Sequence, residues 1–317
     1  MKTLIIDSQI LTSYQECACK CHYTFNKNIK PPIKEESFDK GGLLHDMLEM
    51  HYGLLKDWYK KESNLPREVY DTFVEKTLIL GQQSASQRDL DTEDCLRVIG
   101  AYRQYADFRF GESWIPKFIE QVGAKELWKG IISSKDVYDG THDGIVHYKK
   151  EEEELQILYA GKVDLVAQIE WDDEKPAIID HKTEERASDP IQLNNQMMGY
   201  AWMFDVRNII VNKVGFQNTL PPAAKFRRYT LHYPESVLNE WKENTIRWAI
   251  KLYHSLQDLK AMENDRNYHS CAGKYGKPCG LLPICITEPA ARDWKINSSF
   301  LIGEEWDVTR RLAKERN

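Results

Sequence analysis

The sequence predicts an α/β fold, because a strand-rich middle section lies between sections with helical patterns. Apolar runs bounded by turn-forming residues occur between about 126 and 182, which is typical of strands. Apolar residues recur at helical spacing in 41–59 and again in 235–263. A chain of 317 residues with 42% hydrophobic content can bury a sizeable core without disulfide bonds.

The N-terminal third is expected to be mainly helical. A short extended segment opens the chain and precedes a helix capped by Ser8 or Thr12. Two helices are expected within 68–111, where the sequence DTED is a strong helix start. A shorter helix is expected over 115–121.

Strands and helices are expected to share the remainder of the chain. The middle section contains the strand candidates LQILYAGKVDLVAQI and PAIIDHK, joined by the turn-rich WDDEKP. Pro190 is expected to open a helix that ends near Phe204, and two further strands precede one long helix at 235–263. The tail from Asn267 shows little regular pattern.

Charge and hydropathy patterning argue against a membrane protein. No apolar run approaches the roughly 18 residues that a membrane span needs. The first residues contain one lysine and an apolar patch broken by Asp7, which is too weak for a signal peptide. The net charge of −6 does not by itself indicate a nucleic-acid-binding protein. We therefore expect a cytoplasmic protein with no membrane partner.

Two aspartates and a lysine fall on the two strand candidates. Asp164 lies within GKVDLV, Asp180 ends PAIID, and Lys182 follows two residues later. Alternate residues of a strand share a face, so Asp180 and Lys182 are expected on one side, and a hairpin would bring Asp164 beside them. A buried unpaired aspartate is costly without a cation, and Mg²⁺ prefers oxygen ligands. D-x-K triplets also arise by chance, but the two buried aspartates favour a metal site.

Three more polar residues have two possible interpretations each. Gln196 and Tyr200 are four residues apart and share one side of the expected helix. They could contact nucleic acid beside a metal site, or they could form a polar face with one core tyrosine. His45 lies beside the apolar stripe of the 41–59 helix. Taken alone, such a histidine is more often a packed helix residue than a metal ligand.

The motifs GKVDLV, IIDHKT and QMMGY together resemble the PD-(D/E)xK nuclease superfamily, and in particular its RecB-like exonuclease branch. That branch has a G-x-x-D strand, a D-x-K strand, a Q-x-x-x-Y helix and an early G-x-x-H context, which residues 42–45 match. The resemblance implies a restriction-endonuclease-like α/β core, with a mixed central sheet flanked by helices. It implies one nuclease domain over 1–317, with a helical insertion at 60–118 and a cysteine-rich region formed by 1–30 with 265–290.

The resemblance also implies roles for individual residues. It assigns a Mg²⁺ or Mn²⁺ ion to His45, Asp164, Asp180 and the main-chain carbonyl of His181. Lys182 would be the catalytic lysine, and Gln196 and Tyr200 would complete the site with the two aspartates. An acidic residue before the first of these strands, such as Glu120 or Glu126, could assist, but the sequence does not distinguish them.

The seven cysteines are unevenly distributed. Three lie at 17, 19 and 21, one at 95, and three at 271, 279 and 285. In a reducing compartment this pattern favours metal or cluster ligation over disulfides, and neither end supplies the paired knuckles typical of zinc sites. The resemblance implies a [4Fe-4S] cluster held by Cys17, Cys271, Cys279 and Cys285. Because Cys19 and Cys21 lie close to Cys17, the identity of the first ligand stays open. A zinc site or free thiols are the alternatives to the cluster. Cys95 is expected to be a small buried residue.

The sequence and the resemblance together predict a metal-dependent DNA exonuclease acting on single-stranded or duplex ends, with single-stranded ends favoured. Two alternatives stay open at this point. One is a DNA-processing subunit of a recombination, repair or CRISPR-adaptation-type complex. Any helicase partner would then be a separate chain, because no P-loop motif occurs in this sequence. The other alternative is a non-catalytic zinc protein that binds nucleic acid through its cysteine-rich region.

Overall fold

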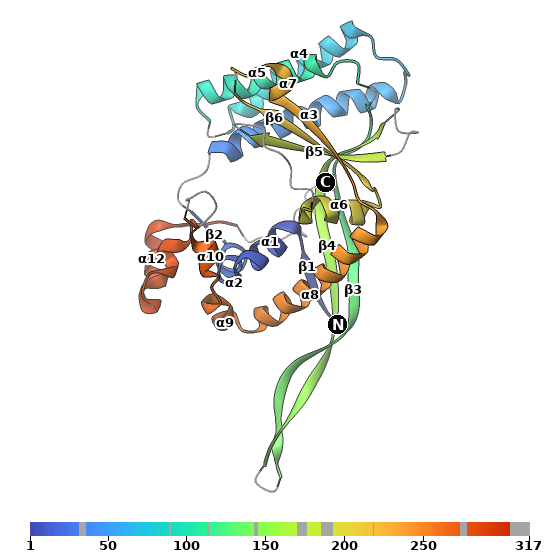
Figure 1. The fold of residues 1–317 in the computed structure, drawn as a ribbon. Coiled ribbons are helices and arrows are strands. Elements are labelled where there is room, and N and C mark those ends of the chain that lie inside the picture. Colours follow the sequence, from blue (N-terminus) through green and yellow to red (C-terminus); the bar gives the residue numbers. More distant parts are fainter. Residues whose placement is uncertain are drawn as a thin grey trace. The chain divides into compact units, whose positions relative to one another are not determined.

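The computed structural model describes residues 1–31, 36–88, 90–112, 114–142, 145–169, 176–184, 193–217, 219–272 and 278–304 (Figure 1). Side chains are described for these residues except 36–38, 134–142, 145–151 and 184. The chain divides into two compact units. We call them the terminal unit (Met1–Ile33, Gly123–Gly161 and Ser236–Asn317) and the central unit (Lys34–Val122 and Lys162–Glu235).

The central unit contains a mixed sheet. β4 (Ile145–Ile169) pairs antiparallel with β5 (Pro176–Glu184). β5 pairs in parallel with β6 (Asn208–Gly215), and β6 pairs antiparallel with β7 (Phe226–His232). The long β3 (Trp114–His142) also pairs with β4. The expected β4–β5 hairpin and mixed sheet are therefore confirmed, while most of WDDEKP lies outside the described residues.

Three helices cover one face of these strands, as Figure 1 shows: α3 (Glu36–Tyr59), α4 (Arg67–Ala85) and α5 (Thr92–Phe108). Alternate strand residues such as Leu165, Ile179 and Ile210 are buried in one core cluster with residues of these helices. A Cβ at Gly41 would lie 2.8 Å from Thr183 Oγ1, so the glycine lets α3 approach β5 closely. α6 (Asn195–Phe204) contacts β6, and the short α7 (Pro222–Lys225) precedes β7.

The terminal unit combines two small strand pairings with helices of 4 to 23 residues. β1 (Lys2–Ile6) pairs in parallel with residues 155–159 of β4, and β2 (Ile29–Lys30) pairs antiparallel with β8 (Leu301–Ile302). Its α-helices are α1 (Ser8–Glu16), α2 (Ala18–Cys21), α8 (Glu235–Gln257), α9 (Leu259–Asn264), α10 (Tyr268–Cys271), α11 (Leu282–Cys285) and α12 (Arg292–Ser299). A π-helix (His22–Asn26) follows α2, and a 3-10 turn (Pro289–Ala291) precedes α12.

Aromatic contacts hold α8 against its neighbours in this unit. The Trp241 ring lies edge-on to Tyr159 of β4, with 5.2 Å between centroids. Tyr14 of α1 lies edge-on to Trp248 and its hydroxyl is 2.6 Å from Ser255 Oγ. Among the helices that the structure describes, none is long and apolar enough to cross a membrane.

The structure shows which residues cap α1 and α6, and the cap of α1 differs from the sequence-based expectation. Asp7, and not Ser8 or Thr12, caps α1, because its Oδ1 accepts hydrogen bonds from Gln9 N at 2.9 Å and Ile10 N at 2.8 Å. A carboxylate at this position also offsets the positive end of the helix dipole. Asn194 caps α6 in the same way. The expected start at Pro190 lies outside the described residues.

Three other predicted elements differ in type or extent. The helix expected over 115–121 is wrong, because these residues belong to β3; aromatic and β-branched side chains in WIPKFIE suit a strand. The single helix expected at 235–263 is interrupted after Gln257, where Asp258 begins a new cap by accepting from Ala261 N at 2.9 Å. The tail expected to lack regular structure contains the short helices α10, α11 and α12.

Candidate metal-dependent nuclease site

β4 and β5 bring two aspartates together at one end of their pairing. Leu165 pairs with Ile179, so Asp164 and Asp180 are the next residues of the antiparallel ladder. Asp164 Oδ2 accepts a hydrogen bond from the main-chain N–H of His181 at 2.7 Å. Asp180 is only 1% exposed, so its carboxylate is largely removed from water.

A line of polar contacts connects Asp180 with α6. Lys182 Nζ lies 2.8 Å from Asp180 Oδ2 and donates to Gln196 Oε1 at 3.0 Å. Gln196 Nε2 donates to the Tyr200 hydroxyl at 2.9 Å, across one turn of the helix. Asp180 and Lys182 are two residues apart on a strand, so their side chains lie on the same face of β5. Gln196 and Tyr200 of α6 approach that face.

His45 and Glu120 lie beside Asp164. His45 Nδ1 is 3.6 Å from Asp164 Oδ2, and one ligand atom from each of the three residues lies within 4.8 Å of the others. Lys162 Nζ is 2.5 Å from Glu120 Oε2. The backbone of Glu120 has φ 49°, in the left-handed region that residues other than glycine rarely adopt. Such outliers are typical of functional sites, where the surroundings hold the strained conformation.

Burial changes the protonation preferences of this group. Burial raises the pKa of Glu120 to about 7, against the opposing effect of the Lys162 ammonium. Burial and then the neighbouring charge of Asp180 raise the pKa of Asp164 to about 7. Burial lowers the pKa of His45, which favours the neutral imidazole that ligates metals. A cation among these side chains would offset the cost of ionising two buried carboxyls.

Comparison with known proteins identifies the family of the chain. A sequence model of the PD-(D/E)XK nuclease superfamily matches residues 9–285. The chain belongs to this superfamily. No curated protein matches it. Among solved structures, the crystal structure of SSO0001 matches with 14% sequence identity and a TM-score of 0.30, covering 76% of this chain and 96% of that chain.

Membership in the PD-(D/E)XK superfamily supports a hydrolytic nuclease, and nucleases of this superfamily use divalent metals. The side chains of the site fit such an ion. The ligand atoms of one imidazole and two carboxylates lie within 4.8 Å of one another, and Asp180 lies opposite Asp164 on the paired strand. Asp180 Oδ2 contacts the Lys182 ammonium but makes no hydrogen bond of good geometry, which leaves it acceptor capacity. An oxygen-rich set with one histidine suits Mg²⁺ or Mn²⁺.

In this PD-(D/E)XK chain, the sequence-predicted residues do not all reach the site by their side chains. Six are brought together there: His45, Asp164, Asp180, Lys182, Gln196 and Tyr200. The His181 ring faces the other side of β5, where it stacks on Tyr52 at 5.5 Å and 24° between planes. The structure also distinguishes the two acidic candidates. Glu120 of the central unit lies beside Asp164, whereas Glu126 of the terminal unit accepts a hydrogen bond from Gln156.

Asn212 of β6 supports the buried side of the D-x-K strand. Its Nδ2 donates to the Tyr105 hydroxyl at 2.5 Å and lies 2.9 Å from His181 Nδ1. We expect Asn212→Ala to lower the free energy of unfolding by about 1–3 kcal/mol, because the Tyr105 hydroxyl and the His181 ring each lose one buried partner. Urea unfolding measures this change. In the control Asn208→Ala, on the same strand, the contact with His232 that is lost is an exposed one, so the change should stay within about 0.5 kcal/mol; equal losses would contradict the assignment.

The terminal unit gathers cysteines from distant parts of the sequence. Cys19 Sγ lies 3.8 Å from Cys285 Sγ, and the Cys279 N–H donates to the Cys271 carbonyl at 3.1 Å. A hydrogen bond from Cys19 lowers the pKa of Cys17 to about 5 and that of Cys285 to about 7. Lowered values favour the thiolate, which is the form that binds metals.

Two cysteines differ from this group. Cys21 Sγ lies 3.9 Å from the Ile10 carbonyl, and burial raises its pKa to about 12. Cys95 belongs to α5 of the central unit, and its Sγ lies 3.9 Å from the Leu90 carbonyl. Both environments suit packed, protonated thiols better than metal ligands.

Proposed function

We propose that this protein is a Mg²⁺- or Mn²⁺-dependent DNA exonuclease of the RecB-like branch, acting on single-stranded ends. The polar contacts from Asp180 through Lys182 and Gln196 to Tyr200 are the observation that supports this most directly. They join the D-x-K strand to the Q-x-x-x-Y helix on one face, in a chain whose superfamily consists of nucleases. DNA is therefore the proposed macromolecular partner.

The proposed mechanism divides the work between acidic residues and Lys182. The metal ligands would be His45, Glu120, Asp164, Asp180 and the main-chain carbonyl of His181. When bound, a divalent cation neutralises charge on the phosphate and acidifies water. Lys182, held by Asp180 and Gln196, would orient the attacking water and stabilise the charge that develops on the phosphate.

The proposed reaction is an in-line hydrolysis of a phosphodiester. The water oxygen bonds to phosphorus while the bond from phosphorus to the 3′ oxygen breaks, and a proton from the water passes to the departing oxygen. The products then carry a 5′ phosphate and a 3′ hydroxyl. Gln196 and Tyr200 act by keeping the Lys182 ammonium in place.

We also propose a structural [4Fe-4S] cluster held by Cys17, Cys271, Cys279 and Cys285. The lowered pKa values of Cys17 and Cys285 support thiolates at these two positions, whereas burial raises the pKa of Cys271. The 3.8 Å between Cys19 Sγ and Cys285 Sγ brings thiols from the N-terminal and C-terminal cysteine groups together, and a cluster needs such convergent cysteines.

A time course on labelled DNA tests the proposed activity. Single-stranded and duplex oligonucleotides labelled at the 5′ or the 3′ end are incubated with and without Mn²⁺. We expect stepwise shortening of single strands that requires the metal, and removal of the metal by chelation should abolish it. Internal cutting without shortening from an end would contradict an exonuclease, and DNA binding without any metal-dependent cleavage would contradict a nuclease.

Glu120→Gln tests the carboxylate that the sequence did not single out. We expect the Mn²⁺ concentration for half-maximal cleavage to rise by about tenfold or more, because the group near Asp164 loses a charged ligand. A metal titration of the cleavage rate measures it. Glu126→Gln is the matched control, since Glu126 is exposed on the same strand and contacts Gln156. An unchanged metal requirement in Glu120→Gln would exclude Glu120 as a ligand.

A further inference from the structure

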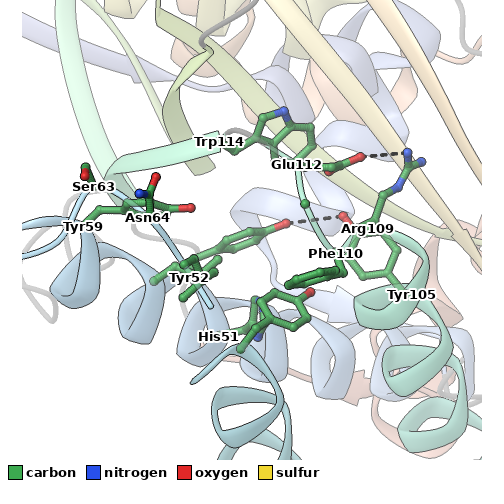
Figure 2. A pocket seen from close by; sticks show the side chains of 14 residues that line it. His51, Tyr52, Tyr59, Ser63, Asn64, Tyr105, Arg109, Phe110, Glu112 and Trp114 are labelled. Carbon is green, nitrogen blue, oxygen red and sulfur yellow. Dashed lines mark hydrogen bonds and ion pairs between the residues drawn. The ribbon is translucent and has the colours of Figure 1, made fainter. Parts of the chain in front are cut away.

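A cavity of about 220 Å³ in the central unit lies on the helical side of the sheet (Figure 2). Six aromatic residues contribute to its lining: Tyr52, Tyr59, Tyr70, Tyr105, Phe110 and Trp114. They come from α3, α4, α5, the turn after α5 (Phe110) and the start of β3. Drug-sized ligands occupy cavities of roughly 300–1,000 Å³, so this one suits a single planar ring system better than a larger molecule.

The cavity opens to solvent on the side of two turns. Ser63, Asn64 and Gly111 all line it and all are exposed. Gly111 has φ 83°, a conformation that favours glycine, and it shapes the turn between α5 and β3. Tyr59 and Phe110 are half-buried, so aromatic surface reaches the mouth. A planar group could therefore enter from solvent and contact rings without unfolding a helix.

The wall formed by Arg109 and Glu112 has an excess of positive charge when Arg228, which pairs with Glu112 but does not itself line the cavity, is included. Arg109 and Arg228 share one carboxylate, Glu112, with contacts of 3.0 Å from Arg109 and 2.9 Å from Arg228. The Arg228 guanidinium also lies 4.0 Å from the centre of the Trp114 ring. Two guanidinium groups and one carboxylate leave a net positive charge, which attracts an anionic ligand.

The cavity shares a helix and an aromatic layer with the candidate catalytic site. Tyr52 lines the cavity and stacks on His181, the residue between Asp180 and Lys182. His45 and Tyr52 are seven residues apart on α3, so they share a helix face about 10 Å apart along the axis. Tyr59 at the mouth is fourteen residues from His45 on the same helix, about 21 Å along the axis, so a strand bound at the catalytic site would have to extend by several nucleotides to enter the cavity.

We propose that this cavity receives one unpaired base of the DNA strand held for cleavage. The proposal rests on the proposed DNA nuclease function and adds a base-binding subsite to it. Aromatic rings stack on any base, and the positive wall suits a ligand whose backbone is anionic. The polar side chains of Ser63 and Asn64 at the mouth offer hydrogen bonds to the edge of a base.

The test uses single-stranded oligonucleotides that each lack one base, at successive positions from the cleaved bond. With Mn²⁺, we expect one position several nucleotides from that bond to lower kcat/KM by about tenfold, mainly through KM, because the stacking of one base is lost. Tyr59→Ala should raise KM for the intact strand by a similar factor and remove this position-specific penalty. Tyr59→Phe keeps the ring and should behave as the wild type.

The design separates this subsite from the nuclease activity itself. The same oligonucleotides are measured by fluorescence anisotropy without metal, so the result does not depend on cleavage. Leu80→Ala, a truncation of an exposed side chain on α4, is the matched control and should change neither profile. Equal effects of base removal at every position, or a penalty that persists in Tyr59→Ala, would overturn the subsite. A position-specific affinity loss without cleavage by the wild type would support the subsite and overturn the proposed nuclease function instead.

Discussion

Replacing Lys182 by alanine is expected to lower kcat by about 10²–10³-fold while DNA affinity stays nearly unchanged. The Lys182 ammonium lies between Asp180 Oδ2, at 2.8 Å, and Gln196 Oε1, at 3.0 Å, so its position is fixed before substrate binds. A fixed cation contributes most where charge develops during the reaction, and it contributes little to binding an extended strand. Steady-state cleavage of a labelled single strand with Mn²⁺ measures kcat, and fluorescence anisotropy measures affinity.

Stability has to be measured beside activity for this substitution, because Lys182→Ala removes the charge next to a carboxylate that is 1% exposed. Asp180→Asn is the complementary variant, since it keeps the shape and removes the charge. We expect it to lose cleavage as well and to melt close to the wild type. Lys76→Ala, at an exposed position of α4, is the lysine control. Full activity of a folded Lys182→Ala protein with metal present would refute the catalytic assignment.

The part of the site built from β4 and β5 could be predicted from sequence because strand geometry is local. The period of two puts Asp180 and Lys182 on one face and turns His181 to the other. Antiparallel pairing of neighbouring strands then brings Asp164 next to Asp180. Both relations follow from short stretches of sequence, so these positions did not need the rest of the fold, whereas the mixed sheet was expected from the family resemblance.

Glu120 shows why other parts could not be predicted. Its segment was expected to be a helix, whereas it forms the start of β3, and its backbone adopts a φ of 49°. Such a conformation is held by tertiary contacts, including the ion pair with Lys162, and leaves no signal in local propensity. The aromatic cavity was missed for a related reason. Its lining comes from several elements between His51 and Trp114, and their convergence depends on how three helices pack.

Cys285→Ser and Cys17→Ser are each expected to remove the visible absorption and the iron of the proposed cluster and to destabilise the terminal unit. The residues joined in this unit are distant in sequence, with Cys285 following Cys19 at a separation of 266 positions. A cross-link that closes a loop of this length removes roughly 5 kcal/mol of conformational entropy from the unfolded chain. Iron and sulfide analysis of protein purified without oxygen, together with thermal unfolding, measures both effects.

The remaining cysteines provide matched controls for that experiment. Cys21→Ser should keep the absorption, because its thiol is buried against the Ile10 carbonyl and its pKa is raised to about 12. Cys95→Ser should also keep it, because Cys95 lies in α5 of the central unit. Cys19→Ser decides the first ligand: retained absorption supports Cys17, whereas loss in Cys19→Ser with retention in Cys17→Ser would transfer the role to Cys19. If the wild-type protein is colourless and contains stoichiometric zinc, the cysteines form a zinc site and the proposed cluster is wrong. The metal-dependent cleavage proposed for the central unit is tested separately and would not be affected by this result.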